Sequence, residues 1–269
     1  MQSYRAISTI LLVSFTLLSC ISCSPSDKLA AREKITADNC DITVNLDAVE
    51  ELSVTPHLIS QFYTYYREHQ YELTYLPDFS AENNEPDWND LSYYILLRYV
   101  TLGDDRPPLT KEKFQELLQE IMLPVKYTDG SSFILDYADG LYTGGGFDVS
   151  GTKYYRLIHL SRDEQQVYTA VFDVLTFAEA ESAFPETSPN TRAVIDYAIT
   201  HLDYTSEEAL SRGPKFHQAI EAIFLEDNYT ELLDLSGQVT VQFTLTDDPD
   251  SPFYYVSCLW QPNESALFN

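Results

Sequence analysis

The chain has 269 residues and is strongly acidic, with 42 Asp and Glu side chains, 16 Lys and Arg side chains and a formal net charge of −26. This charge argues against nucleic acid as a partner, because nucleic acids are bound through clusters of Lys and Arg and the basic residues here are scattered. The 20 Tyr and 14 Phe side chains supply large rings for a core. Tyr-rich faces also bind sugars or peptides, but we interpret most of these rings as structural.

The first 19 residues predict a cleaved signal peptide. Residues 1–5 carry one positive charge, and residues 6–18 form an uncharged, mostly apolar run of thirteen residues. As a helix this run would reach ~20 Å, which is too short for a hydrocarbon layer of ~30 Å. The run also lacks the polar stripe of an ordinary amphipathic helix at the edge of a core. A signal peptide therefore fits the segment better than a membrane-spanning helix does.

The segment Leu17-Leu18-Ser19-Cys20 resembles the lipobox of bacterial lipoproteins, in which aliphatic and small residues precede an invariant Cys. The resemblance implies cleavage before Cys20 and a diacylglyceryl group on its thiol. A second frame ends at Cys23, but it places Cys20 where Leu is expected, so we favour Cys20 and keep Cys23 as the alternative. The resemblance covers only the signal. It implies an exported chain that lipid anchors to the cell membrane or outer membrane, with an extracytoplasmic body.

The mature chain is expected to contain a lipidated tether, residues 20–39, and a body, residues 40–269. Residues 24–39 have few large apolar side chains, so we expect a flexible segment. If Cys20 carries the lipid, then Cys23, Cys40 and Cys258 remain. If Cys23 carries it, Cys40 and Cys258 remain as a pair that the export compartment would allow to form a disulfide.

Apolar periodicity and turn residues predict the elements of the body in chain order. Helices are expected from Pro56, from Trp88 and after the N-cap Thr110. Strands are expected over 133–137, 153–160 and 166–177, with a Gly-rich turn over 140–151. Two further helices are expected from Pro189 and from Gly213-Pro214. A hairpin of 239–245 with 253–260 closes the chain, and Val239, Val241, Phe243 and Leu245 are expected to share one buried face without a bulge.

Helices that precede adjacent antiparallel strands indicate the α+β class, with helices packed on an antiparallel sheet. The order of elements is similar in residues 40–180 and 181–269, so two related halves are one interpretation. The helix–helix–sheet order also loosely resembles cystatin-like folds. That resemblance carries no functional residues with it.

The Gly-rich turn supplies one candidate contact site, because Tyr142 and Phe147 flank three adjacent glycines. Three glycines make a loop costly to order, so we expect both rings to be at least partly exposed and to contact a ligand. Ser150 and Lys153 have the Ser-x-x-Lys spacing of penicillin-interacting enzymes, but a turn and a strand surround them instead of a helix. We interpret that match as chance.

The metal and acid–base candidates are weaker. Three carboxylates crowd the tip of the last hairpin and form a weak calcium candidate: Asp247, Asp248 and Asp250. Pro249 and Pro252 mark this segment more simply as a turn, so no metal is expected there. No pair of the five histidines has metal-ligand spacing, and no cofactor is expected: His57, His69, His159, His201 and His217.

These observations favour a non-enzymatic, lipid-anchored extracytoplasmic module that binds or organises something at the cell envelope. Its expected partners are the membrane, through the lipid, and an envelope glycan or protein. The alternative is a cell-envelope hydrolase whose site is assembled from residues far apart in the sequence.

Overall fold

The computed structural model describes residues 50–101, 106–121, 125–144, 152–177, 188–205, 207–208, 213–246 and 252–263. The signal peptide, the tether and the first part of the body lie outside these ranges, and so do Cys20, Cys23 and Cys40. Phe147 and the acidic hairpin tip with Asp247, Asp248 and Asp250 also lie outside them.

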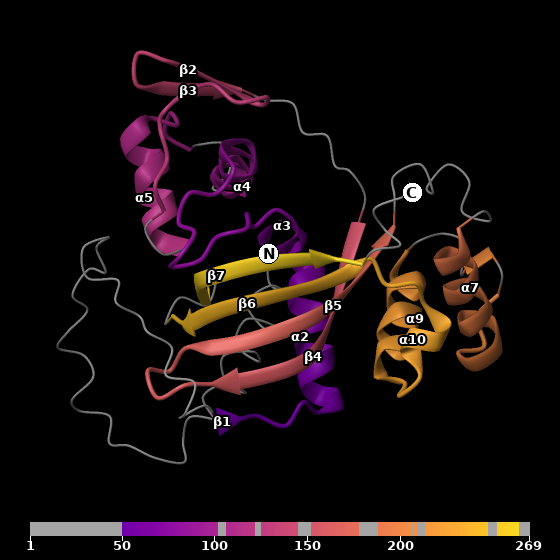
Figure 1. Ribbon diagram of the computed structural model, residues 1–269. Coiled ribbons are helices and arrows are strands. Elements are labelled where there is room, and N and C mark those ends of the chain that lie inside the picture. The colour runs from indigo at the N-terminus through magenta and orange to yellow at the C-terminus, as the bar shows by residue number, and fades with distance from the viewer. Residues whose placement is uncertain are drawn as a thin grey trace.

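The described residues form an α+β fold, as the sequence predicts (Figure 1). The helices are α2 (Pro56–Glu68), α3 (Gln70–Thr74), α4 (Trp88–Thr101), α5 (Lys111–Ile121), α7 (Pro189–His201), α9 (Pro214–Leu225) and α10 (Tyr229–Leu232). The strands are β1 (Glu50–Glu51), β2 (Leu135–Ala138), β3 (Leu141–Gly144), β4 (Thr152–Arg162), β5 (Tyr168–Phe177), β6 (Gly237–Leu245) and β7 (Phe253–Pro262).

Five strands form the main sheet in the order β1-β4-β5-β6-β7, and each strand is antiparallel to its neighbours. The pair β2–β3 forms a separate hairpin. Since β5 pairs with β6, one sheet combines strands from both of the halves that the sequence suggests. The pairing of β5 with β6 therefore joins the two suggested halves, 40–180 and 181–269, in one sheet.

Side-chain caps stand at the starts of α2, α5 and α7, and of these caps the sequence predicted Thr110. The Thr55 side chain accepts a hydrogen bond from Leu58 N at the start of α2, and Ser188 caps α7 in the same way. Thr110 Oγ1 accepts from Lys113 N over 3.2 Å before α5. Each cap satisfies a backbone N–H that has no partner inside its own helix.

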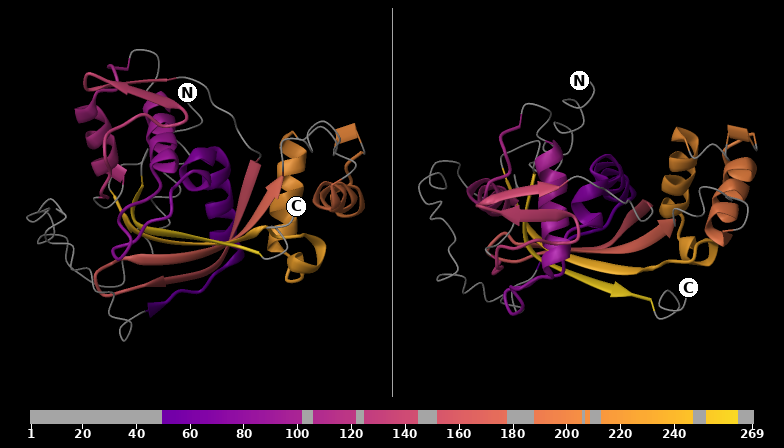
Figure 2. Two further views of the ribbon diagram at one scale, coloured as in Figure 1. Left: turned by 45° about the horizontal axis from the view of Figure 1, so that its top comes forward. Right: turned by 90° about the horizontal axis from the view of Figure 1, so that it is seen from above.

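The helices α2, α3, α4 and α5 lie on one side of the sheet, and α7, α9 and α10 gather at one end of it (Figure 2). The main core lies between α2 and the sheet, where Phe62 packs edge-on against Phe172 with ring centroids 5.5 Å apart. A second core joins α7 and α9 to the ends of β4 and β5, and Tyr63 of α2 stacks there on Tyr154.

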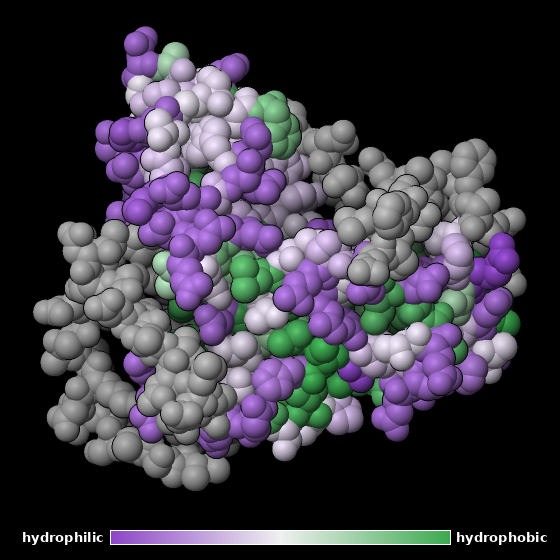
Figure 3. Space-filling model, viewed as in Figure 1, coloured by the Kyte–Doolittle hydropathy of each residue, from purple (hydrophilic) through white to green (hydrophobic). Residues whose placement is uncertain are grey.

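The other face of the sheet is more polar and is seen in Figure 3, where hydrophobic residues show near the middle and hydrophilic ones surround them. Val171, Thr240 and Leu259 lie opposite one another across β5, β6 and β7 on this face. Leu259 is 44% exposed. The alternation along β6 is therefore the expected one, with polar residues outward.

The buried face of β6 agrees with the prediction for Val239, Val241 and Phe243, while Leu245 is only partly buried. The expectation of a hairpin without a bulge is wrong. The register shifts between Gln242 and Phe243, which pair with Ser257 and Tyr255, so Val256 is an extra residue on β7. The bulge leaves the alternation of β6 intact because the additional residue belongs to the partner strand.

Candidate functional site

A cleft of about 490 Å³ lies between the sheet and the helices that cover it. Its helix side consists of the end of α3, the segment that follows as far as Asp78, and the first turns of α4. Residues of β4, β6 and β7 form its sheet side, and Phe133 adds to its rim just before β2. A volume of this size is typical of small-molecule sites.

Backbone contacts with β7 hold one wall of the cleft in place. Phe79 and Cys258 exchange two backbone hydrogen bonds of 2.9 Å, so the segment after α3 pairs with the edge of the sheet. The Trp260 N–H donates to Asp78 Oδ1 over 2.9 Å. Asp78 therefore has a defined position at the rim although its side chain is exposed.

Lys153 brings a half-buried ammonium group into the cleft from β4. Its Nζ atom lies 5.0 Å from the centre of the Trp260 ring, a cation–π contact. Within the described residues this ammonium donates no hydrogen bond and forms no ion pair. Burial lowers the pKa of Lys153, and the charges of Asp78 and Asp90 oppose this shift only in part. The protonated form therefore lacks an acceptor that a bound ligand could supply.

Two carboxylates, Asp78 and Asp90, line the same cleft at its rim. Partial burial raises the pKa of Asp90, and the neighbouring carboxylates of Asp87 and Asp78 raise it further, while Lys153 opposes the shift. No other described side chain donates a hydrogen bond to the Asp90 carboxylate. A positively charged or hydrogen-bond-donating group would relieve this repulsion.

Aromatic rings form much of the remaining surface. Tyr75 and Tyr93 pack with ring centroids 4.7 Å apart, and Tyr93 stacks on Phe133 with centroids 5.9 Å apart. Phe133 is 68% exposed, the largest exposure among the large hydrophobic residues in the described ranges. Trp260 supplies a further ring from the sheet side. Such surfaces hold an apolar group with little loss of side-chain entropy.

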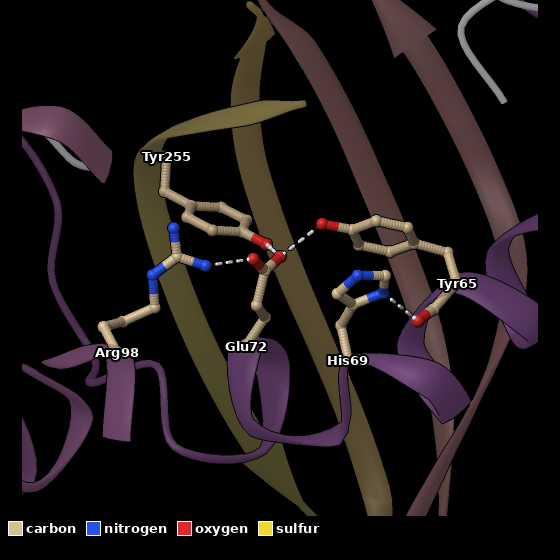
Figure 4. A network of polar contacts seen from close by, with 5 residues as sticks. All are labelled: Tyr65, His69, Glu72, Arg98 and Tyr255. Carbon is tan, nitrogen blue, oxygen red and sulfur yellow. Dashed lines mark hydrogen bonds and ion pairs between the residues drawn. The ribbon is translucent and has the colours of Figure 1, made fainter. Parts of the chain in front are cut away.

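A polar network centres on the buried Glu72 (Figure 4), next in the chain to Leu73, which lines the cleft. The Glu72 carboxylate accepts a 2.6 Å hydrogen bond from Arg98 and bonds of 2.7 and 3.0 Å from the hydroxyls of Tyr65 and Tyr255. The Tyr65 ring also stacks on His69, whose Nδ1 lies 2.9 Å from the Tyr65 carbonyl oxygen. The charge of Glu72 is thus both paired and hydrogen-bonded, as a buried carboxylate requires.

The network joins residues from four different elements of the chain. Tyr65 belongs to α2, Glu72 to α3, Arg98 to α4 and Tyr255 to β7. Since the end of α3 lines the cleft, the network fixes the helix side of the cleft relative to its sheet side. Burial raises the pKa of Tyr65 well above its usual range, and the Glu72 carboxylate raises it further. Tyr65 therefore remains a neutral donor.

The expectation that Tyr142 is exposed is wrong. Leu141–Gly144 is strand β3, and the Tyr142 side chain is buried with only 3% exposed. Its ring packs 5.0 Å from Phe114 and 4.6 Å from Tyr137, and its hydroxyl donates a 2.7 Å hydrogen bond to Asp129. Because β3 pairs with β2, alternate residues of β3 point inward. The adjacent glycines made this segment look like a turn in the sequence.

The structure does not describe the other site candidates. Phe147, Ser150, the lipidation candidates Cys20 and Cys23, and the calcium candidates Asp247, Asp248 and Asp250 lie outside the described residues. Cys258 is a buried free thiol in the described structure, and Cys40 lies outside it. Across the described ranges, no three His, Cys, Asp or Glu side chains group as metal ligands would.

Sequence reasoning missed Asp78, Asp90 and Trp260 as site residues, and it dismissed Lys153 with the Ser-x-x-Lys match. These residues come from elements that are far apart in the chain. One signal was present in the sequence: Lys153 lies in a predicted strand two residues before Tyr155, hence on the same face as a core ring. A charged residue on a buried strand face marks a position that requires an explanation.

No protein-family model matches the chain, and neither a curated protein nor a solved structure is significantly similar to it. In the ranges that the structure covers, every helix is too short or too polar to cross a membrane.

Proposed function

We propose that this chain is a lipid-anchored extracytoplasmic module of the bacterial cell envelope that binds a small organic ligand in the cleft. The observation that carries the proposal is the half-buried ammonium of Lys153 in an aromatic-lined cleft of about 490 Å³. Concave sites with a few polar groups among apolar walls are the usual form of a small-molecule site.

The envelope address rests on the sequence. The apolar run that ends in Leu17-Leu18-Ser19-Cys20 and the polar segment after it support lipidation and a tether. A body carried on a tether would present the cleft to small molecules that reach the envelope. The strong negative charge would keep this body away from anionic headgroups.

A thermal-shift screen tests the binding function. Purified protein without the signal and tether cysteines would be heated with a library of amino acids, peptides, sugars, polyamines and nucleosides. We expect at least one class to raise Tm for the unmodified body but not for Lys153→Met. Lys126→Met is the matched control, because Lys126 is 65% exposed and lies outside the cleft. A library without any cleft-dependent ligand would contradict the proposal.

The two carboxylates of the cleft favour a second candidate, a cell-envelope hydrolase. Asp90 has a raised pKa and shares the cleft with Asp78, and such pairs can act as general acid and general base. A binding module should release its ligand unchanged, whereas a hydrolase should convert it. Mass spectrometry of the ligand after incubation separates the two, and Asp90→Asn should abolish conversion only if the hydrolase candidate is correct.

A further inference from the structure

We propose that the ligand of the cleft is a zwitterion of the amino-acid or short-peptide class, with its carboxylate on Lys153, its ammonium group near Asp90 and Asp78, and its side chain against the aromatic rings. This inference rests on the proposed binding function and names the ligand class for that site.

Lys153 selects the anionic end of the ligand. Its ammonium faces a cleft in which the carboxylates are close enough to affect its pKa but do not bond to it. A ligand carboxylate would provide the missing acceptor, and a charge-assisted hydrogen bond of this kind is stronger than a neutral one. A ligand without an anionic group would leave this charge unsatisfied in a half-buried place.

Asp90 and Asp78 select the cationic end. One oxygen of Asp78 accepts from the Trp260 N–H, which leaves the other oxygen for a ligand. The Asp90 carboxylate has no hydrogen-bond donor within the described structure. A purely anionic ligand would meet two carboxylates at the rim and a formal net charge of −26 on the chain. An ammonium group beside the ligand carboxylate removes that penalty.

The aromatic rings select the side chain. Trp260 lies on the sheet side, while Tyr93 lies on the helix side and stacks on Phe133 at the rim. An aromatic or large aliphatic side chain would contact these rings and cover part of the exposed Phe133 ring. The volume of the cleft has room for an amino acid or a dipeptide.

Isothermal titration calorimetry with four probes tests the charge assignment. The probes are L-phenylalanine, phenylalanyl-phenylalanine, L-phenylalaninamide, which lacks the carboxylate, and N-acetyl-L-phenylalanine, which lacks the ammonium group. We expect at least one zwitterion to bind, and both blocked analogues to bind at least tenfold more weakly. A stronger response to the dipeptide would identify a peptide site, and a stronger response to phenylalanine an amino-acid site.

Two variants link each charge to its residue. Lys153→Met should weaken binding of the zwitterion at least tenfold but should not weaken binding of the cationic L-phenylalaninamide, and Lys153→Arg should restore part of the affinity. Asp90→Asn should weaken the zwitterion but strengthen binding of the anionic N-acetyl-L-phenylalanine, because one of the two rim carboxylates that repel it is removed. Lys126→Met and Asp136→Asn are the controls, because both side chains are exposed outside the cleft. Circular dichroism would establish that each variant is folded.

The outcomes separate this inference from the proposed function. If none of the four probes binds, or if the blocked analogues bind as well as the zwitterions, the zwitterion assignment is wrong. The binding function would still stand if another compound from the screen loses its effect in Lys153→Met. If no compound depends on the cleft, both proposals fail.

Discussion

Lys153 and Trp260 meet across the width of the sheet. Lys153 belongs to β4 and Trp260 to β7, and β5 and β6 lie between these strands, yet Lys153 Nζ is 5.0 Å from the centre of the Trp260 ring. Side chains of two strands that are not neighbours thus come together at the cleft, where the ring of Trp260 contacts the ammonium group of Lys153.

The Glu72 network predicts a strong coupling in stability. Glu72→Leu should cost about 3–5 kcal/mol, because it removes the buried carboxylate that pairs with the half-buried Arg98 guanidinium and accepts from two tyrosine hydroxyls. Arg98→Met should cost a similar amount, because it removes the positive charge that pairs with the buried Glu72 carboxylate. The double variant should cost less than the sum of the two, since no uncompensated charge remains. Urea denaturation measures all three, and strictly additive losses would show that the pair is not coupled.

Tyrosine burial predicts a loss of stability at alkaline pH. Burial raises the pKa of Tyr65, Tyr66, Tyr94 and Tyr255 above the ordinary value of 10.0. Since the unfolded chain loses these protons first, their contribution is complete below about pH 10 and declines as pH rises beyond it. Denaturation between pH 8 and pH 11 should show this decline. Phenolate absorbance of these rings should appear together with unfolding, and ionisation in the folded protein would contradict their burial.

The burial of Tyr142 predicts a contrast in stability with the exposed Phe133. Tyr142→Ala should cost about 3–5 kcal/mol, as removal of a buried ring does. Tyr142→Phe should cost only about 1–3 kcal/mol, because it removes the hydrogen bond to Asp129 alone. Phe133→Ala is the control and should change the free energy of unfolding by less than about 1 kcal/mol, because its ring is 68% exposed. A loss for Tyr142→Ala as small as the one expected for Phe133→Ala would show that Tyr142 is not a core residue.

The sequence predicted elements whose signals are local. The helix starts at Pro56 and Pro189 and the cap Thr110 were predicted because a Pro in the first turn, or a cap three residues from the N–H that it satisfies, marks a helix start. Strand β6 was predicted because its alternation places one face in the core. The helix α3 was missed, since its five residues, Gln70–Thr74, are too few to show a period.

The site was harder to predict than the fold. Lys153, Asp78 and Trp260 come together only through the strand order and through the pairing of Phe79 with Cys258. Neither relationship can be read from spacing along the chain. The error at Tyr142 has a related cause. A segment rich in glycine can still contain a strand, because strand pairing is a non-local interaction.

Lipidation at Cys20 predicts that a substitution of this residue changes the processing of the chain. Cys20→Ala should abolish the incorporation of labelled palmitate, because the thiol is the attachment point that the lipobox resemblance implies. Mass spectrometry of the mature protein should place its N-terminus at Cys20. Lipid on Cys23 would move the anchor by three residues, and an unmodified chain that retains residues 1–19 would contradict the lipoprotein interpretation.

The fluorescence of Trp260 tests the cleft most directly. The chain has 2 Trp, and Trp88 packs against Tyr127 outside the cleft, so Trp88→Phe leaves Trp260 as the sole indole reporter. Each compound that raises Tm in the screen would be titrated into this variant. We expect a saturable change in Trp260 emission that is lost when Lys153→Met is added. A compound that binds and stabilises the protein but leaves Trp260 emission unchanged would contradict it.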